Sequence, residues 1–215
     1  MKYSIVIPCY NEQNLSHLLT DIQDISNAPL IVIDDASDNP SIKDNINENL
    51  YILRNKKNKG KGYSILKGIA KSNSLNCNYT LVMDADGQHS PSDINLFLKN
   101  ISDKDLVLGY RDFYKNMPLH RVISNKIASF IISFIVGQNI KDSQCGFRLY
   151  KNSLFNLSEF SEKGFQFESE FLLKKVKKIK IMQIPIKTIY NSNNVSKINY
   201  FSDSYKFIKL IIKYI

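Results

Sequence analysis

The sequence has few cysteines, and no apolar run in it is long enough to cross a bilayer. Cys9, Cys77 and Cys145 form an odd set without C-x-x-C spacing, which argues against a disulfide-stapled scaffold and favours free thiols in a reducing compartment. The longest apolar stretch, residues 127–137, is shorter than the ~20 residues that a membrane-spanning helix needs. The first eight residues meet a proline too early to form a signal peptide. We therefore expect a cytoplasmic protein.

Acidic residues are scarce relative to basic ones. The 215 residues include 20 Asp and Glu against 29 Lys and Arg, a formal net charge of +9. This excess favours an anionic partner, which could be a nucleic acid, an acidic membrane or a phosphorylated small molecule. A hydrophobic content of 43% and a charged content of 23% argue against global disorder. With no internal repeat and no low-complexity linker, we expect one domain.

Short β-branched runs alternate with helical patterns along the chain. They predict buried strands at residues 3–8, 30–33, 51–54, 79–83 and 105–108, and two further strands at residues 146–150 and 181–186. The remaining periodic segments predict helices at residues 12–24, 41–47, 62–72, 91–100, 119–136, 167–180 and 200–215. This alternation predicts an α/β fold with a central, mostly parallel sheet, whose ligands bind beyond the carboxyl ends of the strands.

The clearest signal for chemistry is Asp84-Ala85-Asp86-Gly87-Gln88, which follows an apolar strand. At a strand end, residues i and i+2 project to the same side, so Asp84 and Asp86 can converge on one cation. Their oxygen ligands suit Mg²⁺ or Mn²⁺, ions that also bind substrate phosphates. The alternative is an acidic turn before a helix, because Ser90 and Pro91 look like an N-cap and a first helical proline. That alternative leaves the two aspartates unexplained, so we favour a metal site.

Polar residues also follow the first expected strand, in the segment Pro8-Cys9-Tyr10-Asn11-Glu12. A base or ribose could stack and hydrogen-bond there. An equally good interpretation is a hydrophobic side chain followed by a helix cap at Asn11.

Two further clusters lie at expected strand ends or turns. Asp35 could accept a hydrogen bond from a base or ribose, although the aspartates near Pro40 could instead start a helix. Lys61 belongs to the glycine turn Asn58-Lys59-Gly60-Lys61-Gly62, which suits phosphate or base contact. Such lysines are often only solvated.

In this order the motifs resemble the family-2 glycosyltransferases of the GT-A fold, and among them the dolichyl- and polyprenyl-phosphate sugar synthases. The resemblance covers nearly the whole chain, and its further segments are residues 34–37, 109–111, 142–148, 167–171, 184–186 and 196–197. Two departures concern Cys145, where related sequences often carry serine, and residues 193–195, where the family usually has a glycine. The resemblance implies a single Rossmann-like GT-A domain at residues 1–199.

The resemblance also implies roles for individual residues. The nucleotide-sugar donor, linked to UDP or GDP, would be contacted by Pro8, Tyr10, Glu12, Asp35, Lys61, Asp84 and Ala85. The metal, Mg²⁺ or Mn²⁺, would be surrounded by Asp84, Asp86 and Gln88. The catalytic set would be Asp86, Arg111, Arg121, Arg148, Glu170 and Lys197, with the four cations placed around the donor and acceptor phosphates. Each cation alone could be a surface charge, and Glu170 could simply favour a helix N-terminus.

The leading hypothesis is an inverting transferase that uses direct displacement at the anomeric carbon. A polyprenyl phosphate acceptor is favoured, because a phosphate monoester with a second pKa near ~6 is largely ionised at neutral pH. A hydroxyl acceptor on a glycan needs a general base instead. The sequence pattern identifies no residue as that base, although Glu170 and Asp142 remain possible. The apolar segment 123–136 and the C-terminal stripe could accommodate the isoprenoid tail.

Other classes are also conceivable. A nucleotidyltransferase would carry a glycine-rich loop after the first strand, which this sequence lacks. An RNA- or nucleotide-binding module could use the basic clusters 54–61 and 174–180. These clusters lack interleaved aromatics, and the carboxylates at the strand ends would repel phosphates unless metal were bound. We therefore expect no nucleic-acid partner.

Residues 200–215 predict an amphipathic terminal helix. Phe201, Tyr205, Ile208, Ile212 and Ile215 recur at helical spacing, with Lys206, Lys209 and Lys213 on another side. This pattern favours docking on an anionic membrane surface and a peripheral position at the inner face of the cell membrane. Packing of the helix on its own domain, or at a dimer contact, is nearly as good an interpretation.

Overall fold

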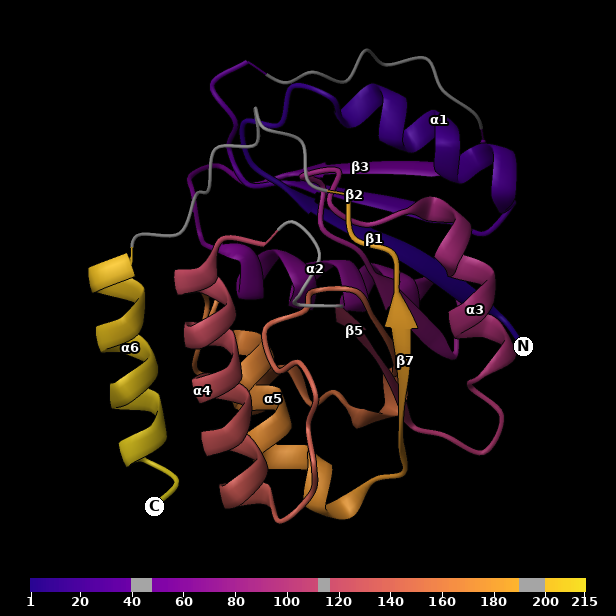
Figure 1. Ribbon diagram of the computed structural model, residues 1–215. Helices are drawn as coiled ribbons and strands as arrows, with labels where there is room; N and C mark the ends of the chain where they lie inside the picture. Colours follow the sequence, from indigo (N-terminus) through magenta and orange to yellow (C-terminus); the bar gives the residue numbers. More distant parts are fainter. Residues whose placement is uncertain (40–47, 112–116, 190–199) are drawn as a thin grey trace.

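The part of the chain that the structure describes forms one seven-stranded sheet with helices on both faces (Figure 1). The computed structural model describes residues 1–39, 48–111, 117–189 and 200–215. Its helices are α1 (Leu15–Ile25), α2 (Lys61–Ser74), α3 (Ile94–Lys99), α4 (Leu119–Val136), α5 (Phe167–Lys175) and α6 (Tyr200–Ile212). Its strands are β1 (Tyr3–Cys9), β2 (Leu30–Asp34), β3 (Leu50–Arg54), β4 (Tyr79–Val82), β5 (Leu106–Arg111), β6 (Arg148–Lys151) and β7 (Ile181–Ile186).

The strand order is β3-β2-β1-β4-β6-β5-β7. The pairs among β3, β2, β1 and β4 are parallel, as is the pair of β5 with β7. β6 lies between β4 and β5 and is antiparallel to both. The prediction of an α/β fold with a mostly parallel sheet is therefore confirmed.

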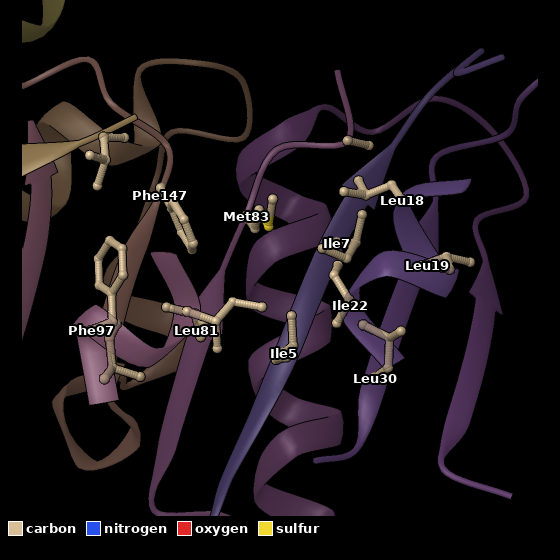
Figure 2. Packing of buried hydrophobic residues seen from close by; sticks show 14 of the residues in the cluster. Ile5, Ile7, Leu18, Leu19, Ile22, Leu30, Leu81, Met83, Phe97 and Phe147 are labelled. Atoms are coloured by element: carbon tan, nitrogen blue, oxygen red, sulfur yellow. The ribbon is translucent and has the colours of Figure 1, made fainter. Parts of the chain in front are cut away.

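The two faces of the sheet bury two separate cores, because side chains alternate along each strand. In β1, Ile5 and Ile7 face the core beneath α1 and α3, whereas Val6 faces the core beneath α2, α4, α5 and α6. Figure 2 shows the first of these cores, in which the rings of Phe97 and Phe147 lie 4.3 Å apart. This alternation explains the near-continuous apolar strands, which are buried on both faces.

Several element boundaries differ from those expected. α1 begins at Leu15 rather than residue 12, because Asn11 adopts a positive φ of 51° and a turn intervenes. The helix expected at 91–100 begins as a 3₁₀ turn, and α5 ends at Lys175 before another one. The helix expected at 41–47 lies outside the described residues.

Candidate active site

Parallel strands bring their carboxyl ends to one edge of the sheet, and most of the motifs meet there. The register pairs Cys9 of β1 with Asp34 of β2, and Asp34 with Arg54 of β3. The Asp84–Gln88 segment follows β4 at the same edge. Because β6 runs in the opposite direction, the segment that precedes it, residues 142–147, also lies at this edge. We call it the catalytic edge.

The loops after β1 and β2 interlock at the catalytic edge. The Asn11 side chain donates to Asp38 Oδ2 and accepts from the Asp38 backbone N–H, both at 2.9 Å. The Asn11 backbone N–H donates to Ser37 Oγ at 2.8 Å. Asn11 therefore joins two loops rather than capping α1, so the helix-cap interpretation is wrong.

Asp35 fixes the glycine turn that precedes α2. Its carboxylate accepts hydrogen bonds from the Asn55 side chain at 2.7 Å, from the Lys59 backbone N–H at 2.9 Å and from the Gly60 backbone N–H at 2.7 Å. Gly60 has a φ of 94°, and a Cβ there would meet the Lys163 carbonyl oxygen at 2.5 Å. Asp35 therefore shapes the loop that presents Lys61.

Lys61 forms a buried charge cluster with two carboxylates. Its Nζ lies 2.6 Å from Asp84 Oδ1 and 2.7 Å from Glu168 Oε1. Burial alone would lower the pKa of Lys61, but the two carboxylates outweigh burial and raise that pKa far above its ordinary value. Burial likewise tends to raise the pKa of Asp84, yet Lys61, with a smaller contribution from His89, holds it well below the usual range. Asp84 is therefore ionised at neutral pH, as a metal ligand must be.

The segment Asp84–Gln88, called the metal motif below, carries residue types that fit a divalent cation that also binds phosphate. Asp84 lies against Gly146, where an added Cβ would come within 2.6 Å of Oδ1. The Asp86 carboxylate accepts from the backbone N–H of Gln88 at 3.0 Å, which folds the turn over the end of β4. Within the described ranges no three His, Cys, Asp or Glu side chains are placed so that they could hold a metal ion on their own. Two carboxylates and an amide still match Mg²⁺, which commonly takes one or two carboxylates and completes its shell with substrate phosphates.

His89 directly follows the Asp84–Gln88 segment and is buried. It is 3% exposed, its Nε2 lies 3.8 Å from Asp84 Oδ2, and its ring lies 5.2 Å from that of Phe147. It also bridges to Thr188, in the chain just after β7. His89 therefore packs beneath the metal motif.

Arg111 is held at the end of β5 by Asp142. The guanidinium donates to both carboxylate oxygens, from Nε at 2.7 Å and from Nη2 at 3.1 Å. Asp142 also accepts from the Gln144 backbone N–H at 3.1 Å. This bidentate pair fixes the orientation of the Arg111 fork at the catalytic edge.

The buried position of Arg148 does not allow its guanidinium to bind the phosphate of a ligand. The side chain is fully buried, and its guanidinium donates to the carbonyl oxygens of Cys145, Glu168 and Ser143 at 2.7, 3.0 and 2.7 Å. These three bonds tie the start of β6 to the first turn of α5. The expectation that Arg148 grips ligand phosphates is corrected: it organises the segments that carry Gly146 and Glu168.

Glu170 is also occupied by structural contacts. Its carboxylate accepts from the Ser161 backbone and hydroxyl and from the Glu162 backbone, and it pairs with Lys174 at 2.8 Å. The expectation of a catalytic Glu170 is therefore corrected to a role in fixing the 161–162 loop. Glu168, two residues earlier, is the carboxylate that reaches Lys61, and the sequence carried no signal that separated the two.

The other expected site residues lie in four different surroundings. Tyr10 and Glu12 are half-buried after β1 at the catalytic edge, whereas Pro8 and Ala85 are buried, with Ala85 packed in the core. Arg121 lies in the first turn of α4. Lys197 lies outside the described residues.

Comparisons with known proteins agree with this geometry. The family model for glycosyl transferase family 2 matches residues 4–157. A UDP-N-acetylglucosamine–dolichyl-phosphate N-acetylglucosaminyltransferase of Methanococcus voltae is 30% identical over 220 residues, which cover 90% of this chain and 88% of that protein. An undecaprenyl-phosphate mannosyltransferase of Micrococcus luteus is 24% identical over 217 residues, which cover 93% of this chain and 88% of that protein.

Solved structures show the same fold at low sequence identity. Glucosyl-3-phosphoglycerate synthase from Mycobacterium tuberculosis superposes with a TM-score of 0.75 at 13% identity, over 99% of this chain and 79% of that one. Mannosyl-3-phosphoglycerate synthase from Rubrobacter xylanophilus gives 0.74 at 12% identity, over 99% and 72%. The chain therefore belongs to glycosyl transferase family 2, and its fold is that of the GT-A glycosyltransferases.

Proposed function

We propose that the chain is an inverting glycosyltransferase that moves a sugar from a UDP- or GDP-linked donor to a polyprenyl phosphate. The names of the relatives from Methanococcus voltae and Micrococcus luteus, both transferases to a polyisoprenoid phosphate, support this acceptor class. Each relative matches along about nine-tenths of this chain, so the comparison extends over the whole transferase domain.

The observation that carries the acceptor assignment is the state of the two carboxylates that could have served as a general base. Asp142 is 1% exposed and is bound on both oxygens by Arg111. Glu170 is also 1% exposed, and its Lys174 partner and three hydrogen bonds occupy both oxygens. A hydroxyl acceptor needs a carboxylate that can take its proton. An ionised phosphate does not, so it suits these surroundings better.

We assign the cation, Mg²⁺ or Mn²⁺, to Asp84, Asp86 and Gln88. When bound, such an ion neutralises the charge that develops on the departing nucleoside diphosphate. Lys61 and Glu168 hold the Asp84 carboxylate in place, and Gly146 leaves room for it. In this proposal Lys61 orients the Asp84 carboxylate, as hydrogen-bonding partners commonly orient metal ligands.

The remaining residues serve to bind and orient the two substrates. Tyr10, Glu12 and the loop shaped by Asp35 offer the surface for the nucleoside. We assign the binding of the donor and acceptor phosphates to Arg111, which Asp142 orients, to Arg121 and to Lys197. The acceptor phosphate oxygen attacks the anomeric carbon as the bond to the donor diphosphate breaks, and the diphosphate leaves with the electron pair. The sugar therefore inverts its configuration.

We place the protein on the inner face of the cell membrane, with residues 1–199 as the transferase domain and residues 200–215 as a docking helix. A lipid acceptor supports this placement, because its isoprenoid tail stays in the bilayer while the phosphate is exposed at the surface.

The test is sugar transfer by the full chain in detergent, from UDP- and GDP-sugars to undecaprenyl or dolichyl phosphate, beside free sugars and oligosaccharides. Asp86→Asn should abolish transfer while the thermal unfolding midpoint stays unchanged. Asp103→Asn is the matched control, because Asp103 is an exposed aspartate in a distant turn, and it should retain full activity. Good transfer to oligosaccharides with none to lipid phosphates would disprove the acceptor assignment. Full turnover by Asp86→Asn in the presence of a chelator would disprove the metal assignment.

A further inference from the structure

An ammonium group of the protein itself contacts the first residue of the metal motif. Lys61, at the start of α2, reaches Asp84, just after β4, and its Nζ lies 2.6 Å from Asp84 Oδ1. The lysine side chain is 15% exposed, so water screens this contact only weakly. Asp84 therefore bears a cation on one of the two oxygens with which it could bind a metal ion.

The second oxygen of Asp84 has close neighbours. His89 Nε2 lies 3.8 Å from Oδ2, and Oδ2 lies so near the backbone of Gly146 that an added Cβ there would clash with it. Asp84 thus has little room to turn away from Lys61. A divalent cation at Asp84 must share the carboxylate with the ammonium, and two cations at one carboxylate repel each other.

Glu168 offers the Lys61 ammonium a second partner. Its Oε1 lies 2.7 Å from the same Nζ, and its side chain is 6% exposed. Arg148 fixes this part of α5 because its guanidinium donates to the Glu168 carbonyl oxygen at 3.0 Å. A lysine carries three donors on a flexible stem, so Lys61 can release Asp84 and keep Glu168. Without Glu168 the same movement would leave a shielded charge without a partner, which is costly.

The backbone around Lys61 is fixed against the segment that leads into α5. The Tyr63 backbone N–H donates to the Lys163 carbonyl oxygen at 3.0 Å. A Cβ at Gly62 would meet the Phe167 Cβ at 2.5 Å, so the turn and the start of α5 are in close contact. The Lys61 backbone therefore stays in place, and any movement between the two carboxylates belongs to its side chain.

We propose that Lys61 controls the access of the divalent cation to Asp84: its ammonium opposes tight binding of the ion until the donor diphosphate is present, and then shifts toward Glu168. This inference rests on the proposed function, because it concerns the ion that the proposed function assigns to the metal motif. The diphosphate brings further oxygen ligands and negative charge, which offset the repulsion between the two cations. The ion and the donor are therefore bound together, and the site excludes free ions.

The experiment is Mn²⁺ binding by the full chain, measured from the electron paramagnetic resonance signal of free Mn²⁺, without nucleotide and with UDP or GDP. The test variants are Lys61→Met, which removes the charge and keeps an apolar stem, and Lys61→Gln, which keeps a hydrogen-bond donor between the two carboxylates. The control is Lys57→Met, which removes an exposed lysine shortly before the same turn. Thermal unfolding midpoints establish which variants fold, and Lys61→Gln replaces Lys61→Met if the buried methionine unfolds the chain.

Without nucleotide, the Lys61 variants should bind Mn²⁺ at least about tenfold more tightly than the native chain and the control. The nucleotide should tighten Mn²⁺ binding by the native chain, and it should do so much less in the Lys61 variants. Glu168→Gln should bind Mn²⁺ less tightly than the native chain, because the ammonium then stays with Asp84. A purely structural role for Lys61 would instead weaken binding in the Lys61 variants as well.

Mn²⁺ binding by the Lys61 variants that equals the native binding, or is weaker, would overturn the inference. So would a gain that disappears in Lys61→Gln/Glu168→Gln, since Glu168 would then act as a new ligand rather than as the second partner of Lys61. Transfer to a polyprenyl phosphate by the native chain reports the proposed function separately. Transfer that requires a divalent cation, together with unchanged Mn²⁺ binding by the Lys61 variants, would leave the proposed function standing and refute the role of Lys61.

Discussion

Replacement of Arg148 by methionine should destabilise the protein rather than weaken the binding of phosphate. The guanidinium is fully buried, and its three carbonyl acceptors lie at 2.7, 3.0 and 2.7 Å. A hydrogen bond from a charged donor contributes about 1.5–3 kcal/mol, and the three carbonyls would be left buried without these donors. Methionine recovers part of the loss through its apolar volume. We expect a net loss of about 3–5 kcal/mol, as for other broken buried charge networks.

The assay is thermal and urea-induced unfolding of Arg148→Met beside the native chain. At about 2–4 °C per kcal/mol for a protein of this size, the midpoint should fall by roughly 10 °C. Arg148→Lys should lie between the two, because a single ammonium cannot reach all three carbonyls. An unchanged unfolding midpoint together with a raised KM for the acceptor would refute the reasoning, and it would support a role for Arg148 in binding the acceptor phosphate.

Three further predictions follow from buried groups near the catalytic edge. Gly146→Ala should reduce transfer at least about tenfold, because its methyl group must displace the Asp84 carboxylate; the measurement is kcat beside the unfolding midpoint, and native kcat would contradict it. Glu170→Gln should lower the unfolding midpoint at pH 7. Although burial tends to raise the pKa of Glu170, its lysine partner and the backbone N–H groups outweigh burial and lower it. A carboxylate whose pKa is lower in the folded than in the unfolded state stabilises the fold at pH values above the unfolded-state pKa, and this contribution is lost as the pH falls. The difference between the unfolding midpoints of the two proteins should therefore shrink below pH 4.5. A difference that is constant from pH 7 to pH 3 would contradict this. Burial, with a smaller contribution from Asp142, raises the pKa of Cys145 to about 12, so iodoacetamide should modify this thiol only after unfolding, and rapid labelling of the native chain would disprove its burial.

Local patterns were enough to predict the strands and the position of the Asp84–Gln88 segment after β4. Most strands are short β-branched runs, and such runs need no long-range information to be recognised. β3 and β7 at the two edges of the sheet are only partly buried, which the runs themselves do not indicate. That Asp84 and Asp86 bind one cation stays a prediction. The alternation of strands and helices then located the catalytic edge.

Pairings between distant segments were not readable in this way. Arg148 and Arg111 look alike in sequence, yet one donates to three buried carbonyls and the other to Asp142. Glu168 and Glu170 are two residues apart on one helix, so they point in different directions, and only the position of α5 decides which of them meets Lys61. Periodicity specifies which face of an element is buried, but it does not specify what lies opposite.

The antiparallel insertion of β6 has a consequence for the order in which the chain can fold. Among the described strands, β5 pairs with β6 and β7 alone, and both follow it in the sequence. On the ribosome, β1 to β4 can assemble as a parallel unit as soon as they emerge, whereas β5 must wait with its backbone groups unpaired. The edge of β4 stays open for the same interval. Synthesis of Arg148–Lys151 supplies the partner of β4 and of one edge of β5, whereas the other edge of β5 stays open until β7 has been made. The interval from β4 to β7 is therefore the one in which the nascent chain exposes unpaired strand edges.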